Sequence, residues 1–198
     1  MDNSLSPASP HIITPYLILI RGLPGSGKSY LAHALRTALG EADVVLLDPD
    51  ATDYASPDYV AMSQELTEQG VDAKFHPYRW LRSQAYAGIT TGKVIIWNQA
   101  FTNLDGFNKT VINLQNFAAE QTVNLPVLVV EVEISHEAAK KRVADRAGQG
   151  GHNVSAEEFD RFINDYRSFA SEGYHVMSVN GESDVTESVD RILTALRA

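Results

Sequence analysis

Three glycines, a lysine and a serine near the start of the chain have the spacing of a phosphate-binding loop. Residues 22–29 read GLPGSGKS, with a short apolar run before them and a helical pattern after them, which matches G-x-x-x-x-G-K-S in its usual context. Glycines allow the backbone N–H groups to approach phosphate oxygens, and a helix N-terminus adds partial positive charge. Lys28 is expected to reach the β- and γ-phosphates of a nucleoside triphosphate, and the Ser29 hydroxyl to ligate Mg²⁺. The residues expected to bind the nucleotide are Gly22, Leu23, Pro24, Gly25, Ser26, Gly27, Lys28, Ser29 and Tyr30.

Two carboxylates follow the second apolar run, where residues 46–50 read LLDPD. Ligands bind at the carboxyl ends of the strands in a parallel α/β sheet, so both acids are expected at the site. Asp48 is expected to hold Mg²⁺ directly or through water. Asp50 is expected to accept a proton from a substrate hydroxyl, as the base in phosphoryl transfer does, with Asp53 as a rival for that role. The alternative is that Asp48 only caps a turn and Asp50 is solvated.

A basic cluster lies at residues 140–146, which hold four of the 16 cations of the chain. Arg142 and Arg146 are four residues apart and therefore share one face of a helix. The small residues that follow, AGQGGHNV at 147–154, suit a hinged flap. We expect a lid at about 142–156 that closes over the nucleotide phosphates, with the two guanidinium groups contacting phosphate oxygens. A solvated helix face is the alternative.

Two other kinds of nucleotide-dependent protein lack support in the sequence. A GTPase needs N-K-x-D for base recognition, but residues 108–111 read NKTV and fall in a helical segment. A motor ATPase needs an acid at the end of the third strand, but the apolar run at 94–97 is followed by Asn98 and Gln99. If the chain uses Mg²⁺, the missing acid shifts the task of holding the ion onto Asp48.

Five short apolar runs alternate with amphipathic segments from residue 16 onward. Short runs rich in valine, isoleucine and leucine are typical of parallel strands buried on both faces. The expected strands are 16–20, 44–47, 94–97, 127–132 and 176–179. The expected helices are 28–39, 57–69, 77–89, 107–120, 137–146 and 185–197, with one more opening at a capping box at 155–158. The alternation predicts an α/β protein with helices on both faces of a parallel sheet.

The helix that opens at the capping box has an aromatic pattern of its own. Phe159, Phe162, Ile163, Tyr166 and Phe169 are expected to share one face. Such a stripe is typical of a helix that packs against the core. Residues 16–198 are expected to form one domain, and the proline- and serine-rich residues 1–15 a flexible arm.

Composition narrows the class of protein. The chain has 198 residues, a net charge of −9 and no cysteine, which excludes disulfide scaffolds, cysteine-ligated zinc and iron–sulfur clusters. An acidic chain is disfavoured as a general nucleic-acid binder, because such binding rests on clustered cations. The sequence shows no secretory signal and no apolar run of about 20 residues, so a cytoplasmic protein without a membrane partner is expected.

Taken together, these motifs resemble those of the P-loop kinases. The resemblance rests on the loop at 22–29, the Asp-x-Asp at 48–50, the R-x-x-x-R at 142–146 and the HNVSAEE that follows at 152–158. It is closest to the group of zeta toxins, chloramphenicol phosphotransferases and polynucleotide 5′-kinases, whereas shikimate and gluconate kinases are more distant. This resemblance implies the three-layer P-loop fold, with a five-stranded parallel sheet in the order 2-3-1-4-5 and a small lid.

The resemblance also implies a reaction, namely transfer of the γ-phosphoryl group of ATP, with Mg²⁺, to a hydroxyl group. The resemblance assigns Ser29 to the metal, and the departure at Asn98 and Gln99 shifts the rest of that task onto Asp48. The catalytic residues that it implies are Lys28, Asp50, Arg142 and Arg146. The acceptor-contacting residues that it nominates are Arg79, Asn98 and Thr102.

The sequence therefore predicts an ATP-dependent phosphotransferase acting on a hydroxyl of a small molecule or a nucleotide-type metabolite. A 5′-hydroxyl polynucleotide kinase is one alternative, because the basic cluster could also serve a nucleic-acid backbone. An ATP-binding regulatory protein with little turnover is the other, since the strand-three acid is missing. The acceptor itself is not specified by these motifs.

Overall fold

Five parallel strands form the centre of the protein in the order β2-β3-β1-β4-β5. The computed structural model describes residues 14–147 and 154–197. The strands are β1 Tyr16–Gly22, β2 Val44–Leu47, β3 Val94–Asn98, β4 Val127–Glu133 and β5 Val176–Asn180. All four strand pairings are parallel. The strand order expected from the resemblance is confirmed, and every strand except β2 runs one or two residues beyond its expected end.

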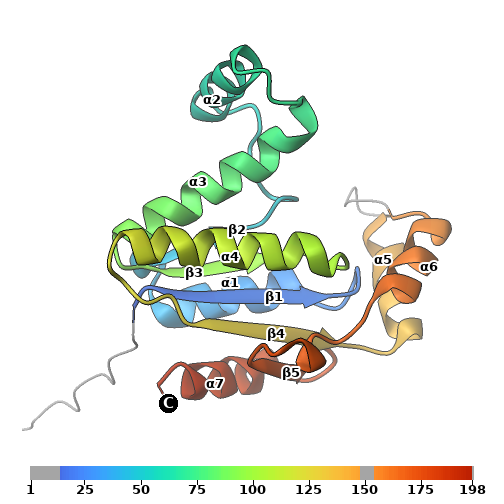
Figure 1. Cartoon of the computed structure of the whole chain (residues 1–198). Coiled ribbons are helices and arrows are strands. Elements are labelled where there is room, and N and C mark those ends of the chain that lie inside the picture. The colour runs from blue at the N-terminus through green and yellow to red at the C-terminus, as the bar shows by residue number, and fades with distance from the viewer. Residues whose placement is uncertain (1–13, 148–153, 198) are drawn as a thin grey trace, which may run out of the picture.

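Helices cover both faces of the sheet, as Figure 1 shows. They are α1 Lys28–Leu39, α2 Pro57–Glu68, α3 His76–Thr90, α4 Leu104–Glu120, α5 His136–Ala147, α6 Ala156–Asp165 and α7 Val185–Ala195. Along β1 the side chains alternate: Ile18 and Ile20 pack with α1 and α7, whereas Leu17 and Leu19 pack with α3 and α4. Because successive side chains of a strand point to opposite faces, β1 contributes to both hydrophobic cores.

The pair α5 and α6 lies beyond the carboxyl ends of the strands, away from both covering layers (Figure 1). Val143 of α5 and Phe159 of α6 are buried in a small separate cluster. The capping box that opens α6 is present, with Ser155 and Glu158 bonded to each other's backbone N–H groups. Residues 148–153 of the expected lid lie outside the described part of the chain, as do residues 1–13 of the expected arm.

The aromatic stripe expected along α6 is only partly correct. The helix ends at Asp165, and Tyr166 already has an extended backbone, with φ −71° and ψ 124°. Phe169 therefore leaves the α6 face and enters the main core, where its ring lies 4.6 Å from that of Phe107. The position of Phe169 is therefore set by its contact with α4 and not by the helical period of α6.

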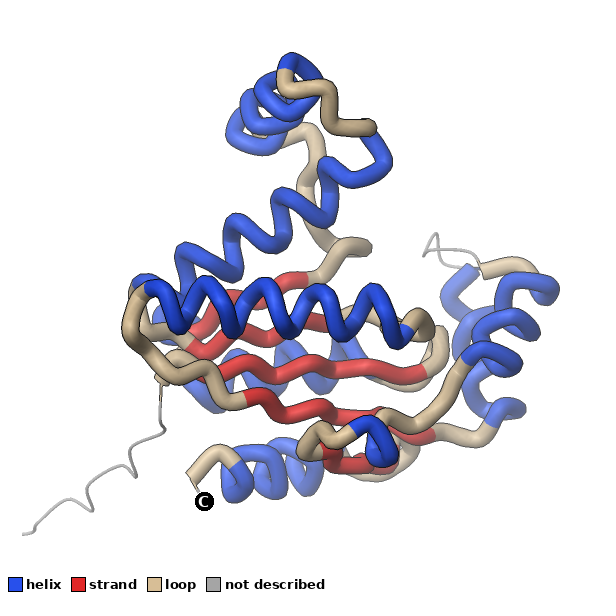
Figure 2. The backbone as a smooth tube through the Cα atoms, viewed as in Figure 1, coloured by secondary structure: helices blue, strands red, loops and turns tan. Residues whose placement is uncertain are grey.

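Helix α2 and the adjoining end of α3 project beyond the edge of the sheet, as the tube in Figure 2 shows. Few contacts stabilise this extension: Tyr59 meets the Trp80 ring edge-on at 5.9 Å, and Ser63 lies 2.8 Å from Nδ1 of His76. Leu66 is the one buried residue of α2. No helix in the described residues is long and apolar enough to cross a membrane.

Candidate active site

The turn from β1 into α1 has the backbone shape of a phosphate-binding loop. Gly25 and Gly27 adopt φ of +81° and +96°, a region that favours glycine. A Cβ atom at Gly25 would lie only 2.6 Å from the carbonyl oxygen of Ala139. The loop therefore needs glycine both for its curvature and for its close approach to α5.

The first turn of α1 presents N–H groups without a side-chain cap. Its N-cap is Gly27, and no acidic residue lies in the first turn. Lys28 folds back over the loop, and its Nζ donates a 2.9 Å hydrogen bond to the carbonyl of Leu23. Uncapped N–H groups at a helix N-terminus, next to a cation, form a binding site for an anion such as phosphate.

Ser29, Asp48 and Asn98 meet where α1, β2 and β3 come together. The amide Nδ2 of Asn98 donates to Oδ2 of Asp48 at 2.6 Å and to Oγ of Ser29 at 3.0 Å. The Ser29 hydroxyl lies 3.3 Å from the same carboxylate oxygen. Asn98, the last residue of β3, thus orients the Asp48 carboxylate.

These three side chains fit Mg²⁺, which prefers oxygen ligands and is usually held by one or two carboxylates together with substrate phosphates. The Oδ1 atom of Asn98 is buried and has no hydrogen-bond partner among the described residues. The Asp48 carboxylate and the Ser29 hydroxyl, held next to each other by one amide, are oxygen donors of the kind that Mg²⁺ takes together with water.

Asp50 lies in the turn after β2, with its side chain exposed. Its backbone N–H donates to Oδ1 of Asp48 at 3.0 Å, which fixes the turn, and Asp50 lines the same cavity as Lys28. Asp53 does not line that cavity, and its carboxylate accepts from the N–H of Ala55 instead. Of the two acids considered as a base, Asp50 is the one at the cavity.

A cavity of about 1150 Å³ joins the loop to the surface between α3, α4 and α5. Aromatic side chains form part of its wall: Phe75, Tyr78, Trp97, Phe101 and Phe107. Two cations, Arg82 of α3 and Lys109 of α4, also line it. The cavity has room for a nucleotide and a second molecule, because ligand pockets are typically ~300–1000 Å³.

Arg142 of α5 lies against the phosphate-binding loop. Its Nη1 donates to the carbonyl of Gly181 at 2.9 Å and lies 3.5 Å from the carbonyl of Gly25. Gly181 was not singled out from the sequence, yet a Cβ atom there would lie 2.2 Å from the Ser26 carbonyl. The backbone of Arg146 belongs to α5, but its side chain lies outside the described part of the structure.

The three nominated acceptor contacts have different positions. Thr102 lines the cavity, and Asn98 lies at its inner end beside Ser29 and Asp48. Arg79 is exposed and is not part of the cavity wall, whereas Arg82 is. The helical phase of α3 is the signal that separates these two arginines, and it requires knowing which face of α3 packs on the sheet.

Comparison with known proteins agrees with these features. The described geometry is that of a P-loop nucleotide-binding fold, and the family model for zeta toxin matches residues 3–180. The chain therefore belongs to the zeta toxin family, whose fold is that of the P-loop kinases. No curated protein gives a sequence match.

Several solved structures share the fold at low sequence identity. Kti12 of Chaetomium thermophilum, in complex with ADP-AlF3, has a TM-score of 0.60 at 16% identity and covers 91% of this chain and 98% of its own. The APS kinase of Mycobacterium tuberculosis, with AMPPNP and APS, has 0.58 at 14%, covering 93% and 99%. A gluconokinase of Sinorhizobium meliloti has 0.55 at 15%, covering 92% of each. At these identities the likeness concerns the fold alone.

Proposed function

We propose that the protein is an ATP-dependent kinase that transfers the γ-phosphoryl group to a hydroxyl of a small molecule or a nucleotide-type metabolite. The observation that carries the proposal is the convergence of Lys28, Asp50 and Arg142 on one cavity. Each of these groups has a separate task in phosphoryl transfer, which depends on positioning and charge stabilisation rather than on covalent chemistry by the protein.

Mg²⁺ would be held by Ser29 and Asp48 together with water and nucleotide phosphates, and when bound it neutralises charge on the phosphate oxygens. Asn98 keeps the Asp48 carboxylate and the Ser29 hydroxyl in place through its amide Nδ2. Asn98 is only 3% exposed and Asp48 8%, so the amide and the carboxylate are shielded from solvent, whereas Ser29 is exposed.

The acceptor hydroxyl would lie between Asp50 and the γ-phosphorus. As its oxygen forms the new P–O bond, the carboxylate of Asp50 takes the hydroxyl proton, and the bond to the β,γ-bridging oxygen breaks to release ADP. Lys28 exchanges its contact with the Leu23 carbonyl for the β- and γ-phosphates. Arg142, with Arg146 from the same helix, stabilises the charge on the group in transit.

A tyrosine near Asp50 is a poor alternative base. Partial burial is the main cause that raises the pKa of the Tyr54 phenol, and the nearby negative charge of Asp50 adds to it. The phenol therefore stays protonated at neutral pH. The carboxylate of Asp50, which is exposed and lines the cavity, is better placed to accept the proton.

Incubation with γ-labelled ATP, Mg²⁺ and pooled hydroxyl compounds tests the proposal, with the Lys28→Ala variant as the blank. Labelled product from a sugar, nucleoside or nucleotide pool is expected with the wild-type chain alone. Labelling of a 5′-hydroxyl oligonucleotide instead would replace the small-molecule acceptor with a polynucleotide. ATP binding without transfer to any pool, or to water, would favour a regulatory binder and contradict the proposal.

A further inference from the structure

A charged pair lies in the apolar interior, next to the phosphate-binding loop. Arg21 is the residue before Gly22 and faces the same side of the sheet as Leu17 and Leu19. It is fully buried, at 0% exposure, and its neighbour Glu131 on β4 is 2% exposed. Burying two charges is costly unless both are paired and hydrogen-bonded. An apolar side chain would satisfy packing here, so the pair needs a further explanation.

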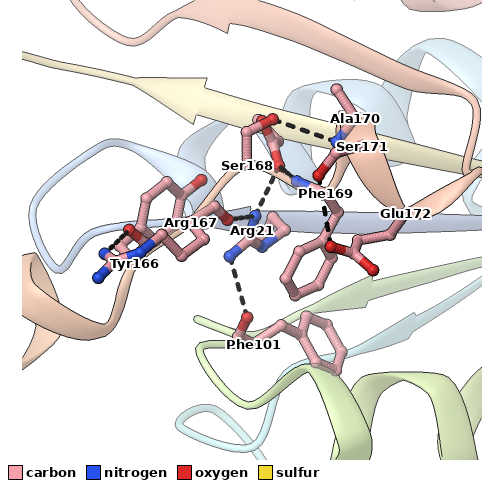
Figure 3. Close-up of polar contacts among 10 residues, drawn as sticks. Arg21, Phe101, Tyr166, Arg167, Ser168, Phe169, Ala170, Ser171 and Glu172 are labelled. Atoms are coloured by element: carbon pink, nitrogen blue, oxygen red, sulfur yellow. Dashed lines mark hydrogen bonds and ion pairs between the residues drawn. The ribbon is translucent and has the colours of Figure 1, made fainter.

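The guanidinium of Arg21 contacts three separate segments (Figure 3). Its Nη1 lies 2.5 Å from Oε1 of Glu131, which is its in-register neighbour on β4. The same nitrogen donates to the carbonyl of Arg167 at 2.6 Å. Nη2 donates to the carbonyl of Phe101 at 3.1 Å. These bonds join β1 both to the loop after β3 and to the segment after α6.

Two aromatic rings enclose the guanidinium plane. The Arg21 Cζ atom lies 4.2 Å from the centre of the Tyr166 ring and 3.6 Å from that of Phe169. Burial raises the pKa of the Tyr166 phenol to about 12, so that ring stays neutral. Cation–π contacts of this kind favour a fixed plane for the guanidinium, and a planar fork then fixes where each carbonyl partner must lie.

Glu131 extends the same network into the chain leaving α6. Its Oε1 accepts from the backbone N–H of Phe169 at 2.8 Å, and its Oε2 accepts from the Ser168 hydroxyl at 2.7 Å. The α5–α6 pair, which carries Arg142, is thereby connected to the strand that leads into the phosphate-binding loop. Neither Arg21 nor Glu131 lines the cavity, so any effect on chemistry passes through other groups.

The loop after β3 depends on this support. Phe101 has a φ of +47°, which is strained for a residue with a bulky side chain. Its ring packs edge-on against Phe107 at 5.3 Å, while Arg21 holds its carbonyl. Gln99, Thr102 and other residues of 99–103 line the cavity on the acceptor side. Residues 99–103 form what we call the acceptor loop. Two contacts of Phe101 hold this loop in place: its ring packs against Phe107, and its carbonyl accepts a hydrogen bond from Arg21.

We infer that Arg21 is a positioning residue that sets the acceptor loop, through the carbonyl of Phe101, relative to the phosphate-binding loop that follows Arg21 in sequence. That residues 99–103 contact the acceptor rests on the proposed function. The hydrogen bond from Arg21 to the Phe101 carbonyl does not depend on it. Removing the guanidinium frees the Phe101 carbonyl and lets the strained loop relax. The distance between the acceptor hydroxyl and the γ-phosphate is then no longer fixed, while the nucleotide site itself is unchanged.

The test uses the double variant Arg21→Met/Glu131→Gln, which removes both charges but keeps a side-chain oxygen at position 131 to accept from the Phe169 N–H. Its control is Ile192→Ala, which opens the core on the opposite face of the sheet. Hydrogen exchange is followed at Gln99, the first residue of the acceptor loop, at Phe107 in the α4 helix that follows the loop, and at Leu31 of α1. All three amides donate hydrogen bonds. The probe nucleotide is Mg-AMPPNP.

In the double variant, the Gln99 and Phe107 amides are expected to exchange roughly tenfold faster while Leu31 stays within about twofold. In Ile192→Ala, the exchange of the Gln99 and Phe107 amides should not be accelerated more than that of the Leu31 amide. With an acceptor from the labelling experiment, the KM for that acceptor should rise roughly tenfold and the KM for ATP stay within about twofold, a split that a loss of global stability does not produce.

Unchanged loop exchange in a folded double variant overturns the inference, and so does acceleration spread evenly over all three amides. If the double variant does not fold, Arg21→Lys decides in its place: an ammonium can still pair with Glu131 but lacks the planar fork. The same loop-confined acceleration is then expected, and its absence overturns the inference. If the wild-type chain transfers no label at all, the proposed function fails, yet the exchange rates still decide the role of Arg21.

Discussion

Asn98 donates a 2.6 Å hydrogen bond to the carboxylate of Asp48, joining the ends of two neighbouring strands directly behind the phosphate-binding loop. The same amide nitrogen reaches the Ser29 hydroxyl at 3.0 Å. The third strand therefore ends in a neutral amide, which orients the carboxylate that follows the second strand. The proposal that Ser29 and Asp48 hold Mg²⁺ rests on these two hydrogen bonds.

Replacing Asn98 with alanine is expected to weaken the use of Mg²⁺. Without the amide, Asp48 and Ser29 lose their shared donor, and changes of this kind behind a metal ligand cost ~10–100-fold in metal affinity or activity. Titration of Mg²⁺ at saturating ATP should give a half-maximal concentration at least about tenfold higher. The control is Asn113→Ala, elsewhere on the cavity wall, which should keep the wild-type Mg²⁺ midpoint. Equal midpoints in the two variants would argue against a role of Asn98 in orienting the Mg²⁺ ligands.

Lys28→Ala is expected to remove detectable transfer. The ammonium is the cation closest in sequence to the uncapped start of α1, and losing one preorganised donor to a developing charge costs ~10²–10³-fold or more. Label transfer to the acceptor measures the loss. Lys74→Ala, which breaks an exposed ion pair with Asp72, should transfer label at the wild-type rate. Robust transfer by Lys28→Ala would show that the loop does not act on phosphate as proposed.

Arg142→Ala should lower kcat by ~10³-fold if the guanidinium stabilises the group in transit. In the structure this arginine donates to the Gly181 carbonyl, a contact that it must give up to reach phosphate. Steady-state kinetics at saturating ATP measure the change. Lys140→Ala, which breaks the exposed pair with Asp160, serves as the control two positions away, and a comparable loss in both variants would point to damage of α5 rather than to chemistry.

The two arginines of α3 should differ in their effect on the acceptor. Arg82 lines the cavity, whereas Arg79 is exposed outside it. Arg82→Ala should raise the KM for the acceptor roughly tenfold, since a hydrogen bond from a charged group contributes ~1.5–3 kcal/mol. Arg79→Ala should leave that KM unchanged. The reverse pattern would mean that α3 presents a different face to the substrate.

Most of the fold could be predicted from local sequence patterns. The loop at 22–29 and the short apolar runs around it depend on neighbours in the sequence, so residues and spacing alone predicted the α/β class and the parallel sheet. The resemblance supplied the strand order. The placement of Asp48 and Asp50 at the carboxyl end of a strand also followed from their neighbours in the sequence, whereas their roles in binding and catalysis stay predictions.

What the sequence missed depends on register and phase between distant segments. Arg21 and Glu131 are 110 positions apart, and only the pairing of β1 with β4 brings them together. The available signal was a charged residue within each of two largely apolar strands, Arg21 in β1 and Glu131 in β4. The choice between Arg79 and Arg82 depends on which face of α3 meets the sheet, and the position of Phe169 depends on where α6 ends, neither of which a helical period alone decides.

In the proposed reaction, Asp50 accepts the proton of the acceptor while the loop at 22–29 holds Mg-ATP. Single-turnover transfer of the labelled γ-phosphate by Asp50→Asn, preloaded with Mg-ATP at a calorimetrically measured Kd, tests it most directly. We expect Asp50→Asn to have a rate ~10²–10⁴-fold below wild type with an unchanged Kd, and the matched variant Asp53→Asn to have the wild-type rate. A wild-type rate for Asp50→Asn, or a loss confined to Asp53→Asn, would contradict it.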